Sequence, residues 1–509
     1  MSSTHNVLYI IADMFRADCL ACTGNPLIQT PNLDRLAAEG TAFTACFNQA
    51  APCGPSRSCI YTSRYLCSTR SLYNETPLVD AEDNFGVALR QAGYEPALMG
   101  YNDYAVDPAV LPDGDPRKTT PSYDNILPGF DCPYFHPLDS EDYFESLRRK
   151  GYPPALLNHE SIHRPNVPEQ GVGTHLDAYY PAQYRREDSE CRYLTERAIE
   201  HVSARTAART RLSDDQGWVL NLNYLKPHPP YVCAAPFHRL YDPAAVPGPV
   251  RRPEELEPEH PYLQLVRASQ GAAEKQLVTN EQHLSELRAI YYGMISEVDD
   301  NLGMLFQALK DAGQWDRTLV IFTSDHGHCL GDHFVQGSEH FYDSAMHVPC
   351  IVRDPAPEAA AARGRQFNHL IESIDLAPTM LEALGVECPD RFCGRSVLGL
   401  LRGDPSCQPR SEIHFEYDYR PMVLNQRPGA NPDEHLYWVV RDHDHKYVQF
   451  ADEGMPPILF DLRADPGEFD NVAGRPEHAP TVARYCQKLL RWRMAHEDQR
   501  MARWAQKYR

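Results

Sequence analysis

The stretch Val7-Leu-Tyr-Ile-Ile-Ala12 decides the fold. It is a continuous apolar run rich in β-branched residues, which is typical of a strand buried on both faces of a parallel sheet. A polar turn follows, and the segment 32–39 then has apolar residues at helical spacing. Gly40 ends that segment, and glycine is favoured just beyond the last turn of a helix. The chain therefore opens with a strand, a turn and a helix.

The same alternation continues through the first three quarters of the sequence. Strands that alternate with helices favour an α/β fold built on a doubly wound, mostly parallel sheet. Two segments with little periodicity, about 105–190 and 233–275, interrupt the pattern and are interpreted as insertions. The spacing predicts helices over 85–92, 194–207 and 284–312, and strands over 95–99, 218–223 and 318–323.

The pattern changes after Gly385. Short strand-like segments separated by turns predict an antiparallel sheet, and a helical pattern follows them. We therefore expect a larger α/β domain over 1–385 and a smaller α+β domain over 386–509, made of an antiparallel sheet and a helix. The strands are expected over 414–420, 437–440, 446–450 and 458–462, and the helix over about 479–496.

Composition limits the classes of function. The 509 residues include 49 Lys and Arg against 70 Asp and Glu, a formal net charge of −21, which argues against general binding to nucleic acids or anionic membranes. No segment approaches the roughly 20 apolar residues of a membrane-spanning helix. The first residues lack the basic start and apolar core of a signal peptide. We expect a cytoplasmic protein whose 15 cysteines are mostly buried thiols.

Acidic residues follow two of the predicted strands. Asp13 comes directly after the opening strand, and Asp325 with His326 comes just after 318–323. Ligands of doubly wound sheets bind beyond the carboxyl ends of the strands, and carboxylates that leave adjacent strands can converge on one hard cation. One such Asp alone would more simply cap the next helix. Two at matched places predict a metal site.

The segment Cys53-Gly-Pro-Ser-Arg57 is the most informative about chemistry. By itself it is typical of a loop that enters a helix with proline in the first turn. It also resembles the Cys-x-Pro-x-Arg signature of type I sulfatases, whose cysteine is oxidised to formylglycine. Asp13 upstream and Asp325-His326-Gly downstream stand in the order of that family, and Tyr61–Arg64 resembles its Leu-Thr-Gly-Arg element.

The resemblance covers most of the chain. Its spacing is most similar to cytoplasmic phosphonate monoester hydrolases and related bacterial arylsulfatases of the alkaline phosphatase superfamily. This implies an alkaline-phosphatase-like fold, in which the doubly wound, mostly parallel sheet is joined by the smaller C-terminal α+β domain. Four further segments that resemble motifs of the family are Pro31–Leu36, Tyr291–Asp299, Ser324–Asp332 and Phe460–Glu468.

The resemblance implies a metal ion and a modified nucleophile. One divalent ion (Ca²⁺, Mn²⁺ or Mg²⁺) would be held by Asp13, Asp325, His326 and the side chain at position 53. A formylglycine-generating maturation enzyme would convert Cys53 into an aldehyde, which is then hydrated. One hydroxyl of the hydrate attacks the ester, and the other later expels the bound acid group.

Further catalytic residues are implied around this centre. Arg57 lies one helical turn beyond Cys53 and can donate hydrogen bonds to the transferred group. Asn74 and Tyr101 fall where the phosphonate hydrolases have an active-site Asn and Tyr, and both can donate hydrogen bonds. His228 corresponds to a histidine that protonates the departing oxygen. Without the resemblance, a loop histidine between prolines would be the simpler interpretation of His228.

The chain departs from the family at several positions. Met14 follows Asp13 where relatives carry a second acidic residue or Gln, and a thioether is a poor ligand for a hard cation. Asp103 ends the element Gly100-Tyr-Asn-Asp103, which replaces one that usually carries a Lys-x-His pair, and Ser338 replaces a lysine. We expect Asp103, Ser338 and His340 to contact the substrate, with His340 as a titratable substitute for a lost cation.

The expected function is hydrolysis of a small sulfate ester. The alternative is hydrolysis of a phosphonate monoester or phosphodiester at the same site, because both reactions place charge on the oxygens around a tetrahedral centre. A different class is a non-catalytic homologue that binds an anion. A redox or zinc protein would rest on Cys19 and Cys22 alone. The tail from Trp492 mixes basic and aromatic residues, and in the related hydrolases such an extension packs on neighbouring subunits, which implies a homodimer or homotetramer.

Overall fold

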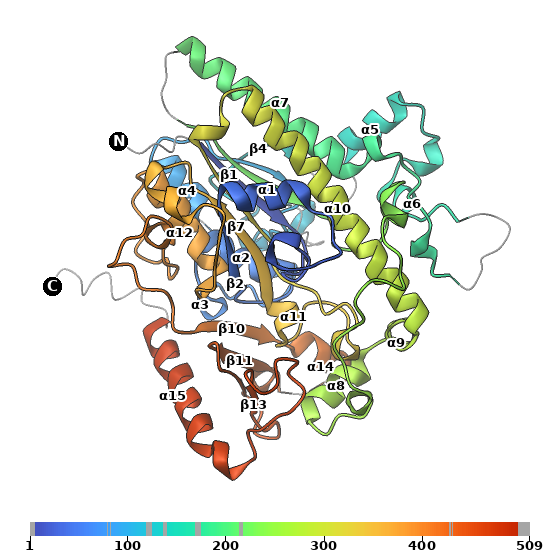
Figure 1. Ribbon diagram of the computed structural model, residues 1–509, viewed down its shortest axis with the longest axis vertical. Coiled ribbons are helices and arrows are strands. Elements are labelled where there is room, and N and C mark those ends of the chain that lie inside the picture. The colour runs from blue at the N-terminus through green and yellow to red at the C-terminus, as the bar shows by residue number, and fades with distance from the viewer. Residues whose placement is uncertain are drawn as a thin grey trace.

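The computed structural model describes residues 6–78, 80–81, 83–118, 125–135, 140–167, 175–212, 217–426, 429 and 431–496. It contains a large sheet flanked by helices and a smaller four-stranded sheet beside it (Figure 1). The end of the tail, from residue 497 onward, lies outside the described residues, so the expectation that it packs on a second subunit stays a prediction.

The large sheet has nine strands. They are β1 (Asn6–Ala12), β2 (Thr41–Phe47), β3 (Ala97–Gly100), β4 (Asp131–Phe135), β5 (Val219–Tyr224), β6 (Thr318–Thr323), β7 (His347–Arg353), β8 (Arg365–Phe367) and β9 (Ile371–Glu372). Their order is β4-β3-β5-β1-β6-β7-β2-β8, and β9 also pairs with β2. β1 is fully buried and runs parallel to both of its neighbours, whereas β7 is antiparallel to β6 and β2. The expected mostly parallel sheet is confirmed.

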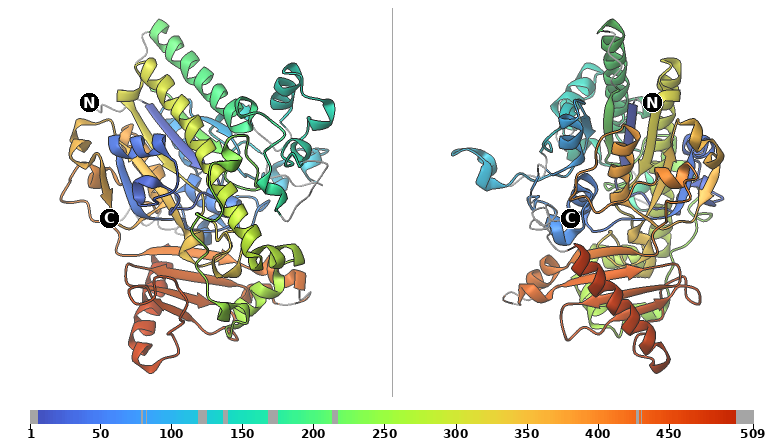
Figure 2. Two further views of the ribbon diagram at one scale, coloured as in Figure 1. Left: turned by 45° about the vertical axis from the view of Figure 1, so that its right-hand side comes forward. Right: turned by 90° about the vertical axis from the view of Figure 1, so that its left-hand side faces the viewer.

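Helices cover both faces of this sheet (Figures 1 and 2). Successive side chains of a strand point to opposite faces, so Leu8 and Ile10 of β1 pack in one core and Val7 and Tyr9 in the other. The first core includes α1 (Pro31–Glu39), α7 (Glu190–Leu212) and α10 (Glu281–Asp311). The second includes α2 (Cys53–Thr62), α4 (Phe85–Gln91), α12 (Leu376–Ala383) and α13 (Leu398–Leu401).

The remaining helices before the second sheet are short. They are α3 (Leu66–Thr69), α5 (Glu141–Arg149), α6 (His159–Ile162), α8 (Pro261–Ser269), α9 (Ala272–Thr279) and α11 (Asp343–Met346). The segment 105–190, interpreted as an insertion, carries α5 and α6 but also supplies β4, the edge strand of the large sheet. Its composition hid this strand, because Asp and Pro are tolerated at sheet edges. In the described part of the chain, no helix combines the length and apolarity needed to cross a bilayer.

The second sheet is antiparallel, as predicted. Its order is β10 (Ile413–Asp418), β11 (Leu436–Arg441), β12 (His445–Phe450) and β13 (Ile458–Asp461), with α14 (Arg420–Gln426) between the first two strands. The last helix, α15 (Ala479–His496), packs Tyr485, Leu489 and Trp492 against β11 to β13. The domain boundary near residue 385 stays a prediction.

One contact between the two sheets lies close to the site. One hydrophobic core contains Phe47 of β2 and Phe415 of β10. The backbone N–H of Glu416 donates to the carbonyl of Gln49 at 2.9 Å, and Ala50 forms an isolated bridge with Glu416. The C-terminal sheet therefore supports the segment that leads into α2.

Candidate active site

The candidate site lies where β1 and β6 end. The two strands are parallel neighbours, with Ile11 opposite Thr323. Their carboxyl ends deliver Asp13 and Asp325 to one edge of the sheet, as the sequence predicts. Both carboxylates are completely buried. The backbone N–H of Met14 donates to Asp325 Oδ1 at 3.1 Å, which ties the two strand ends together.

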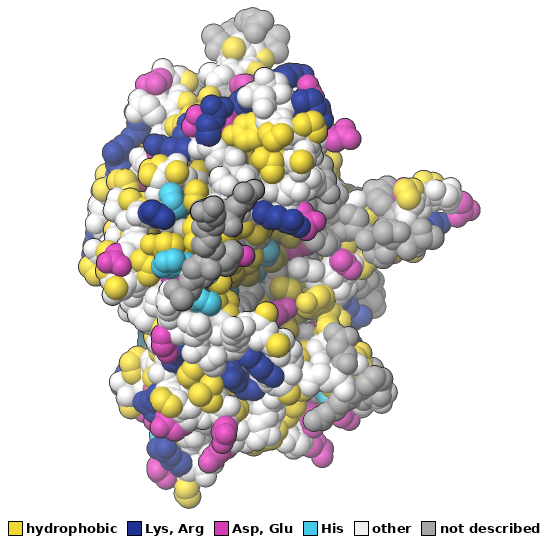
Figure 3. Space-filling view, turned by 90° about the vertical axis from the view of Figure 1, so that its right-hand side faces the viewer, with side chains coloured by type: hydrophobic (Ala, Val, Ile, Leu, Met, Phe, Trp, Pro, Cys, Tyr) yellow, Lys and Arg dark blue, Asp and Glu magenta, His cyan; other side chains and the backbone are white. Residues whose placement is uncertain are grey.

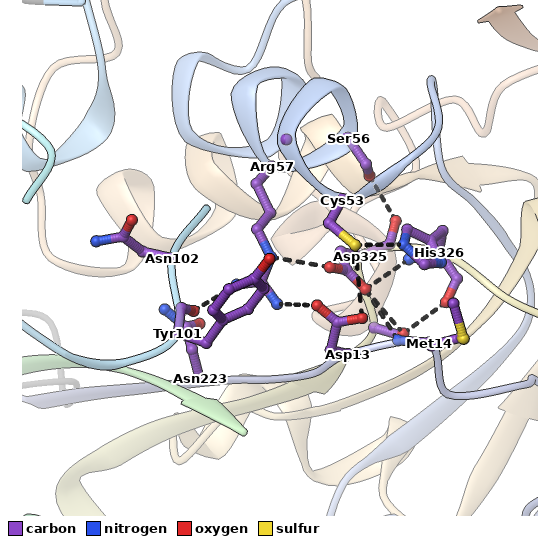
Figure 4. Close-up of polar contacts among 12 residues, drawn as sticks. Asp13, Met14, Cys53, Ser56, Arg57, Tyr101, Asn102, Asn223, Asp325 and His326 are labelled. Carbon is purple, nitrogen blue, oxygen red and sulfur yellow. Dashed lines mark hydrogen bonds and ion pairs between the residues drawn. The ribbon is translucent and has the colours of Figure 1, made fainter. Parts of the chain in front are cut away.

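Cys53 brings a further group to the same place. It is the first residue of α2, which follows the loop that leaves β2. Its Sγ lies 3.1 Å from His326 Nε2 and 3.7 Å from Asp13 Oδ1 (Figure 4). The ligand atoms of Asp13, Cys53, Asp325 and His326 all lie within 4.8 Å of one another. The structure thus brings together the four residues for which a metal site was expected.

Arg57, one turn along α2, is fully buried and points into this cluster (Figure 4). It donates to Asp13 Oδ2 at 3.0 Å, to Asp325 Oδ2 at 2.8 Å and to the Tyr101 carbonyl at 2.8 Å. Its guanidinium also lies 5.1 Å from the centre of the Tyr101 ring. Arg57 therefore neutralises part of the negative charge and orients both carboxylates.

His326 is oriented by its own loop. Its Nδ1 lies 2.9 Å from the Gly327 carbonyl, which only accepts, so Nδ1 carries the hydrogen and Nε2 faces Cys53. The Gly327 N–H donates to the Ala345 carbonyl at 2.8 Å. A Cβ at position 327 would lie 2.3 Å from the Ser344 carbonyl oxygen. The close approach of the two backbones therefore requires glycine beside the metal-site histidine.

Burial dominates the electrostatics of the cluster. It raises the pKa of Asp13 to about 6, and the charge of Asp325 acts in the same direction. For Asp325 the effect of burial is outweighed by Arg57 and His326, which hold its pKa well below the usual range. Burial also raises the pKa of the Cys53 thiol, with Asp13 and Asp325 adding to the rise. Without modification, Cys53 is a neutral thiol and a weak nucleophile.

The donor set fits one hard divalent cation. Asp13 and Asp325 are buried like charges that face the same space, and a cation between them relieves their repulsion. The oriented imidazole of His326 supplies a nitrogen ligand. A side chain that offers oxygen at position 53 suits such an ion better than the thiol sulfur of Cys53 does.

Met14 takes part through its backbone. Its thioether points away from the cluster in Figure 4, in agreement with the expectation that it is no ligand. Its carbonyl accepts a hydrogen bond from the Tyr291 hydroxyl at 2.6 Å, and its φ of 63° lies in the left-handed region, which is uncommon for residues other than glycine. This turn lets the N–H of Met14 reach Asp325.

Asn74 and Asp103 lie around the first turn of α2, and Tyr101 lies beside Arg57. The N–H of Gly54 donates to Asn74 Oδ1 at 2.9 Å. A Cβ at Gly54 would lie 3.5 Å from Asp103 Oδ2. Burial raises the pKa of Asp103 well above its usual range, although Arg57 acts against the rise. The site therefore favours the protonated acid at Asp103.

His228 lies at the rim of the cluster, half-buried in the loop after β5. Its Nδ1 lies 2.7 Å from the Pro229 carbonyl, so Nε2 is the nitrogen left for a proton exchange. It lies close enough to Asp13 for a proton on its ring to lower the pKa of that carboxyl. The loop is held in place because the buried Lys226 donates to Glu297 at 2.7 Å.

Ser338 and His340 are buried in the loop that follows the metal-site histidine. Burial, with His333 acting in the same direction, lowers the pKa of His340 to about 4. The ring is therefore uncharged near neutral pH, which does not support the expectation that it replaces a fixed cation. The roles of Ser338 and His340 in substrate contact stay predictions.

A pocket of about 370 Å³ adjoins the site and was not foreseen from the sequence. Tyr73, which lines it, directly precedes Asn74, and Glu339 in its wall lies close enough to His326 for a protonated imidazole there to lower the pKa of Glu339. Interaction with Glu339 raises the pKa of Tyr73 to about 12. No local pattern marks this pocket, because its walls come from four distant segments around residues 73, 270, 338 and 420.

His328 is a second residue that sequence reasoning missed. It is buried, its Nδ1 lies 3.2 Å from the Gly337 carbonyl, and its Nε2 lies 2.8 Å from the Tyr231 hydroxyl. Burial lowers its pKa to about 3, so the ring is neutral. His328 therefore braces the metal-site loop. The only signal was its place in the run Asp325-His-Gly-His328.

Comparisons with known proteins agree with this geometry. A family model described as Sulfatase matches residues 5–386, and one described as the C-terminal part of N-sulphoglucosamine sulphohydrolase matches residues 331–495. The multifunctional alkaline phosphatase superfamily protein PehA of Trinickia caryophylli is 36% identical over 97% of this chain and 96% of its own. An N-acetylglucosamine-6-O-sulfatase of Bacteroides thetaiotaomicron is 25% identical over 97% of this chain and 87% of its own.

Solved structures extend the likeness to both sheets. The phosphonate monoester hydrolase of Agrobacterium radiobacter has a TM-score of 0.86 at 34% identity, covering 98% of this chain and 97% of that one. The phosphonate monoester hydrolase SpPMH of Silicibacter pomeroyi has a TM-score of 0.86 at 33% identity, covering 97% and 96%. The alkaline-phosphatase-like fold is thereby confirmed. Because the Sulfatase model spans most of the sequence and these relatives span nearly all of it, the chain belongs to the sulfatase family of the alkaline phosphatase superfamily.

Proposed function

We propose that this protein hydrolyses phosphonate monoesters and related phosphodiesters, with sulfate esters as secondary substrates, through a formylglycine formed from Cys53. The observation that carries the proposal is the buried cluster of Asp13, Cys53, Asp325 and His326. It occurs in a chain whose full length resembles two phosphonate monoester hydrolases at TM-scores of 0.86. The preference for phosphonates over sulfates, which reverses the first expectation from sequence, is supported by those relatives.

The modified centre supplies the nucleophile. A hydrated aldehyde at position 53 would supply both the attacking hydroxyl and the hydroxyl that releases the bound acid group. A divalent ion held by Asp13, Asp325 and His326 would lower the pKa of the attacking hydroxyl and neutralise oxygens of the ester. Conversion of Cys53 requires a maturation enzyme, which we place with the protein in the cytoplasm.

The protein's own side chains then complete the reaction. Arg57 holds both carboxylates, so their geometry is set before the substrate arrives. Asn74 fixes the first turn of α2 by accepting from Gly54. His228 uses Nε2 to give a proton to the departing alcohol, because its Nδ1 is engaged with Pro229.

Side-by-side kinetics test the substrate order. Matched aryl phosphonate and aryl sulfate esters are compared on the matured protein loaded with each divalent ion in turn. We expect kcat/KM for the phosphonate to exceed that for the sulfate at least about tenfold, or 1.4 kcal/mol of barrier. A preference for the sulfate would instead support the second candidate, a sulfatase, which the Sulfatase family model favours.

The state of Cys53 separates an enzyme from a non-catalytic homologue. The peptide that contains Cys53 is weighed by mass spectrometry after co-expression with a formylglycine-generating enzyme. We expect the aldehyde, and we expect Cys53→Ala to abolish turnover on both esters. An unmodified thiol, with no turnover, would make this chain an anion-binding protein.

The pocket beside the site indicates what the leaving group carries. None of the twelve described residues that line it is Lys or Arg, and Glu274 and Glu339 are among them. Burial raises the pKa of Glu339, which means that its neighbours do not fully balance the negative charge of this carboxylate. The aromatic rings of Tyr73 and Tyr417 lie in the same walls. Carboxylates and aromatic faces together favour a cationic alcohol.

Paired esters test this preference. One leaving group carries a quaternary ammonium, and its control carries the neutral carbon isostere. We expect Glu339→Gln to lower kcat/KM for the cationic ester about tenfold and to leave the neutral ester unchanged. Glu358→Gln, which changes a carboxyl outside the pocket, serves as the matched control. An equal loss on both esters would show that Glu339 only shapes the site.

A further inference from the structure

The segment His159-Glu-Ser-Ile-His163 places two histidines four residues apart outside the active site. Residues 159–162 form α6, and His163 is its C-terminal cap. Asn158 caps the first turn by accepting from the Ser161 N–H at 2.9 Å. Residues at this spacing lie on the same face of a helix. The two rings are accordingly close, with their centres 4.4 Å apart. Paired histidines on one helical face are a recurrent metal-binding arrangement.

Glu190, the first residue of α7, reaches the same point from another element. Its Oε2 lies 3.0 Å from His163 Nε2. One ligand atom from each of His159, His163 and Glu190 lies within 4.8 Å of the other two. His163 and Glu190 are 5% and 7% exposed, and His159 is half-buried. Two imidazoles and a carboxylate are the donors that catalytic-type zinc sites use.

The hydrogen bonds of His163 orient it toward a cation. Its Nδ1 lies 3.0 Å from the His159 carbonyl, which only accepts, so Nδ1 carries the hydrogen. The Nε2 lone pair then faces the carboxylate of Glu190. Two electron pairs that face each other need a proton or a metal ion between them. Metal-binding histidines are typically oriented in this way, with the distal N–H donated to a carbonyl.

The cluster is arranged for binding rather than for hydrolysis. In metalloproteases with the same spacing, the glutamate between the histidines acts as the base. Here Glu160 is exposed and forms an ion pair with Arg164, so it faces away from the cluster. A metal ion at this place would therefore be structural.

The place of the cluster indicates what such an ion would do. α6 lies toward the right-hand side of Figure 1, the side that faces the viewer in Figure 3. The ring of His163 packs edge-on against Tyr184 at 5.8 Å. The Tyr184 hydroxyl accepts from Lys226, two residues before His228. A link between α6 and α7 would thus steady the segment beside the proton-donor loop.

We propose that His159, His163 and Glu190 form a second divalent-metal site, of a kind suited to Zn²⁺, that pins the segment around α6 to the start of α7.

Metal counting tests this proposal. The protein is stripped with a chelator, loaded with Zn²⁺ and analysed for bound metal, with Co²⁺ absorption as a second readout of geometry. We expect His159→Asn and His163→Asn each to lower the zinc count by one per chain, and to weaken binding at that site at least about tenfold. His175→Asn is the matched control, because His175 also pairs with a glutamate, Glu286, at 2.5 Å.

The outcomes are separable from those at the active site. A fall of one bound zinc ion per chain can be measured whether or not the cluster around Cys53 also holds a metal ion. This measurement does not depend on ester hydrolysis. His159 is half-buried, so its substitution tests the site even where His163→Asn fails to fold. A zinc count that is unchanged in His159→Asn and His163→Asn would overturn the proposal and leave a proton-shared ion pair between His163 and Glu190.

Discussion

At the scale of single residues, Arg57 explains how two buried carboxylates stay side by side. It donates to one oxygen of Asp13 and one of Asp325, and its third bond goes to the Tyr101 carbonyl. Asp13 keeps Oδ1 toward Cys53, whereas Asp325 Oδ1 accepts from the backbone N–H groups of Met14 and His326. A lysine cannot reproduce these three directions, because its ammonium is a single point charge.

Gly54→Ala is expected to damage catalysis more than stability. Its new Cβ would lie 3.1 Å from Asn74 Oδ1 and 3.3 Å from Asn74 Cα, so Asn74 must shift by a few tenths of an ångström, whereas Asp103 Oδ2 at 3.5 Å is in ordinary contact. We expect kcat/KM to fall about tenfold, or 1.4 kcal/mol, while the unfolding free energy changes by less than about 1 kcal/mol. Steady-state kinetics and urea unfolding measure the two effects.

The matched control is Gly474→Ala, at an exposed position where a Cβ meets no atom within 4 Å. It should leave both quantities unchanged. A Gly54→Ala protein with the kcat/KM of the wild type would show that Asn74 does not touch the reacting group.

The site residues that could be predicted are those whose chemical role follows from their position in the sequence. Asp13 and Asp325 follow apolar runs whose carboxyl ends must meet at one sheet edge, and Cys53 stands in a five-residue signature. Glu339 carries no such mark, because its neighbour Tyr73 is brought to it only by the tertiary fold. The charge state of His340 was also out of reach, since it depends on burial.

At the scale of elements, strands buried on both faces were the easiest to predict. The expected strand 318–323 coincides with β6, and the expected helix 479–496 coincides with α15. β2 and β7 were not foreseen, and neither was their antiparallel direction. Side-chain alternation shows which faces of a strand are buried, but it does not show the direction in which the strand runs.

A buried hydrogen bond between β10 and α3 predicts how the stability of the protein depends on pH. Glu416 on β10 accepts from the Cys67 N–H at 3.0 Å, and burial raises its pKa to about 7. The unfolded chain ionises this carboxyl near pH 4, so its contribution to stability is complete below that pH and is lost as the pH rises to about 7. Glu416→Gln keeps the acceptor and removes this loss, which is roughly 3 kcal/mol at most.

Urea unfolding at pH 5 and pH 8 measures the effect. We expect the wild type to lose more stability between the two pH values than Glu416→Gln does. Glu453→Gln, at an exposed position in the same part of the chain, is the control and should behave like the wild type. Parallel pH profiles for Glu416→Gln and the wild type would mean that Glu416 is ionised in the folded protein throughout.

At the scale of the whole molecule, contacts made by the second sheet support the active site. Asp343 begins α11, and the carbonyls of Ser344 and Ala345 accept from the N–H groups of His328 and Gly327 in the metal-site loop. The carboxylate of Asp343 forms ion pairs with Arg441 and Lys446 of the second sheet. The position of the loop therefore depends on ion pairs that cross between the two sheets.

Lys446→Met is expected to loosen this connection. Lys446 on β12 is completely buried, and its ammonium contacts Asp343 at 2.6 Å, the Phe341 carbonyl at 2.7 Å and Glu468. Methionine has a similar length but leaves the buried Glu468 without its cation, whereas Asp343 keeps Arg441. The unpaired buried carboxylate costs about 3 to 5 kcal/mol. Urea unfolding should show this loss, and kcat should fall because α11 holds the metal-site loop.

Lys488→Met is the control, since the partly exposed Lys488 also bridges two carboxylates, Glu412 and Asp442. Such pairs contribute at most about 1 kcal/mol. Equal losses in the two variants would show that the second sheet folds and holds its place independently of Lys446.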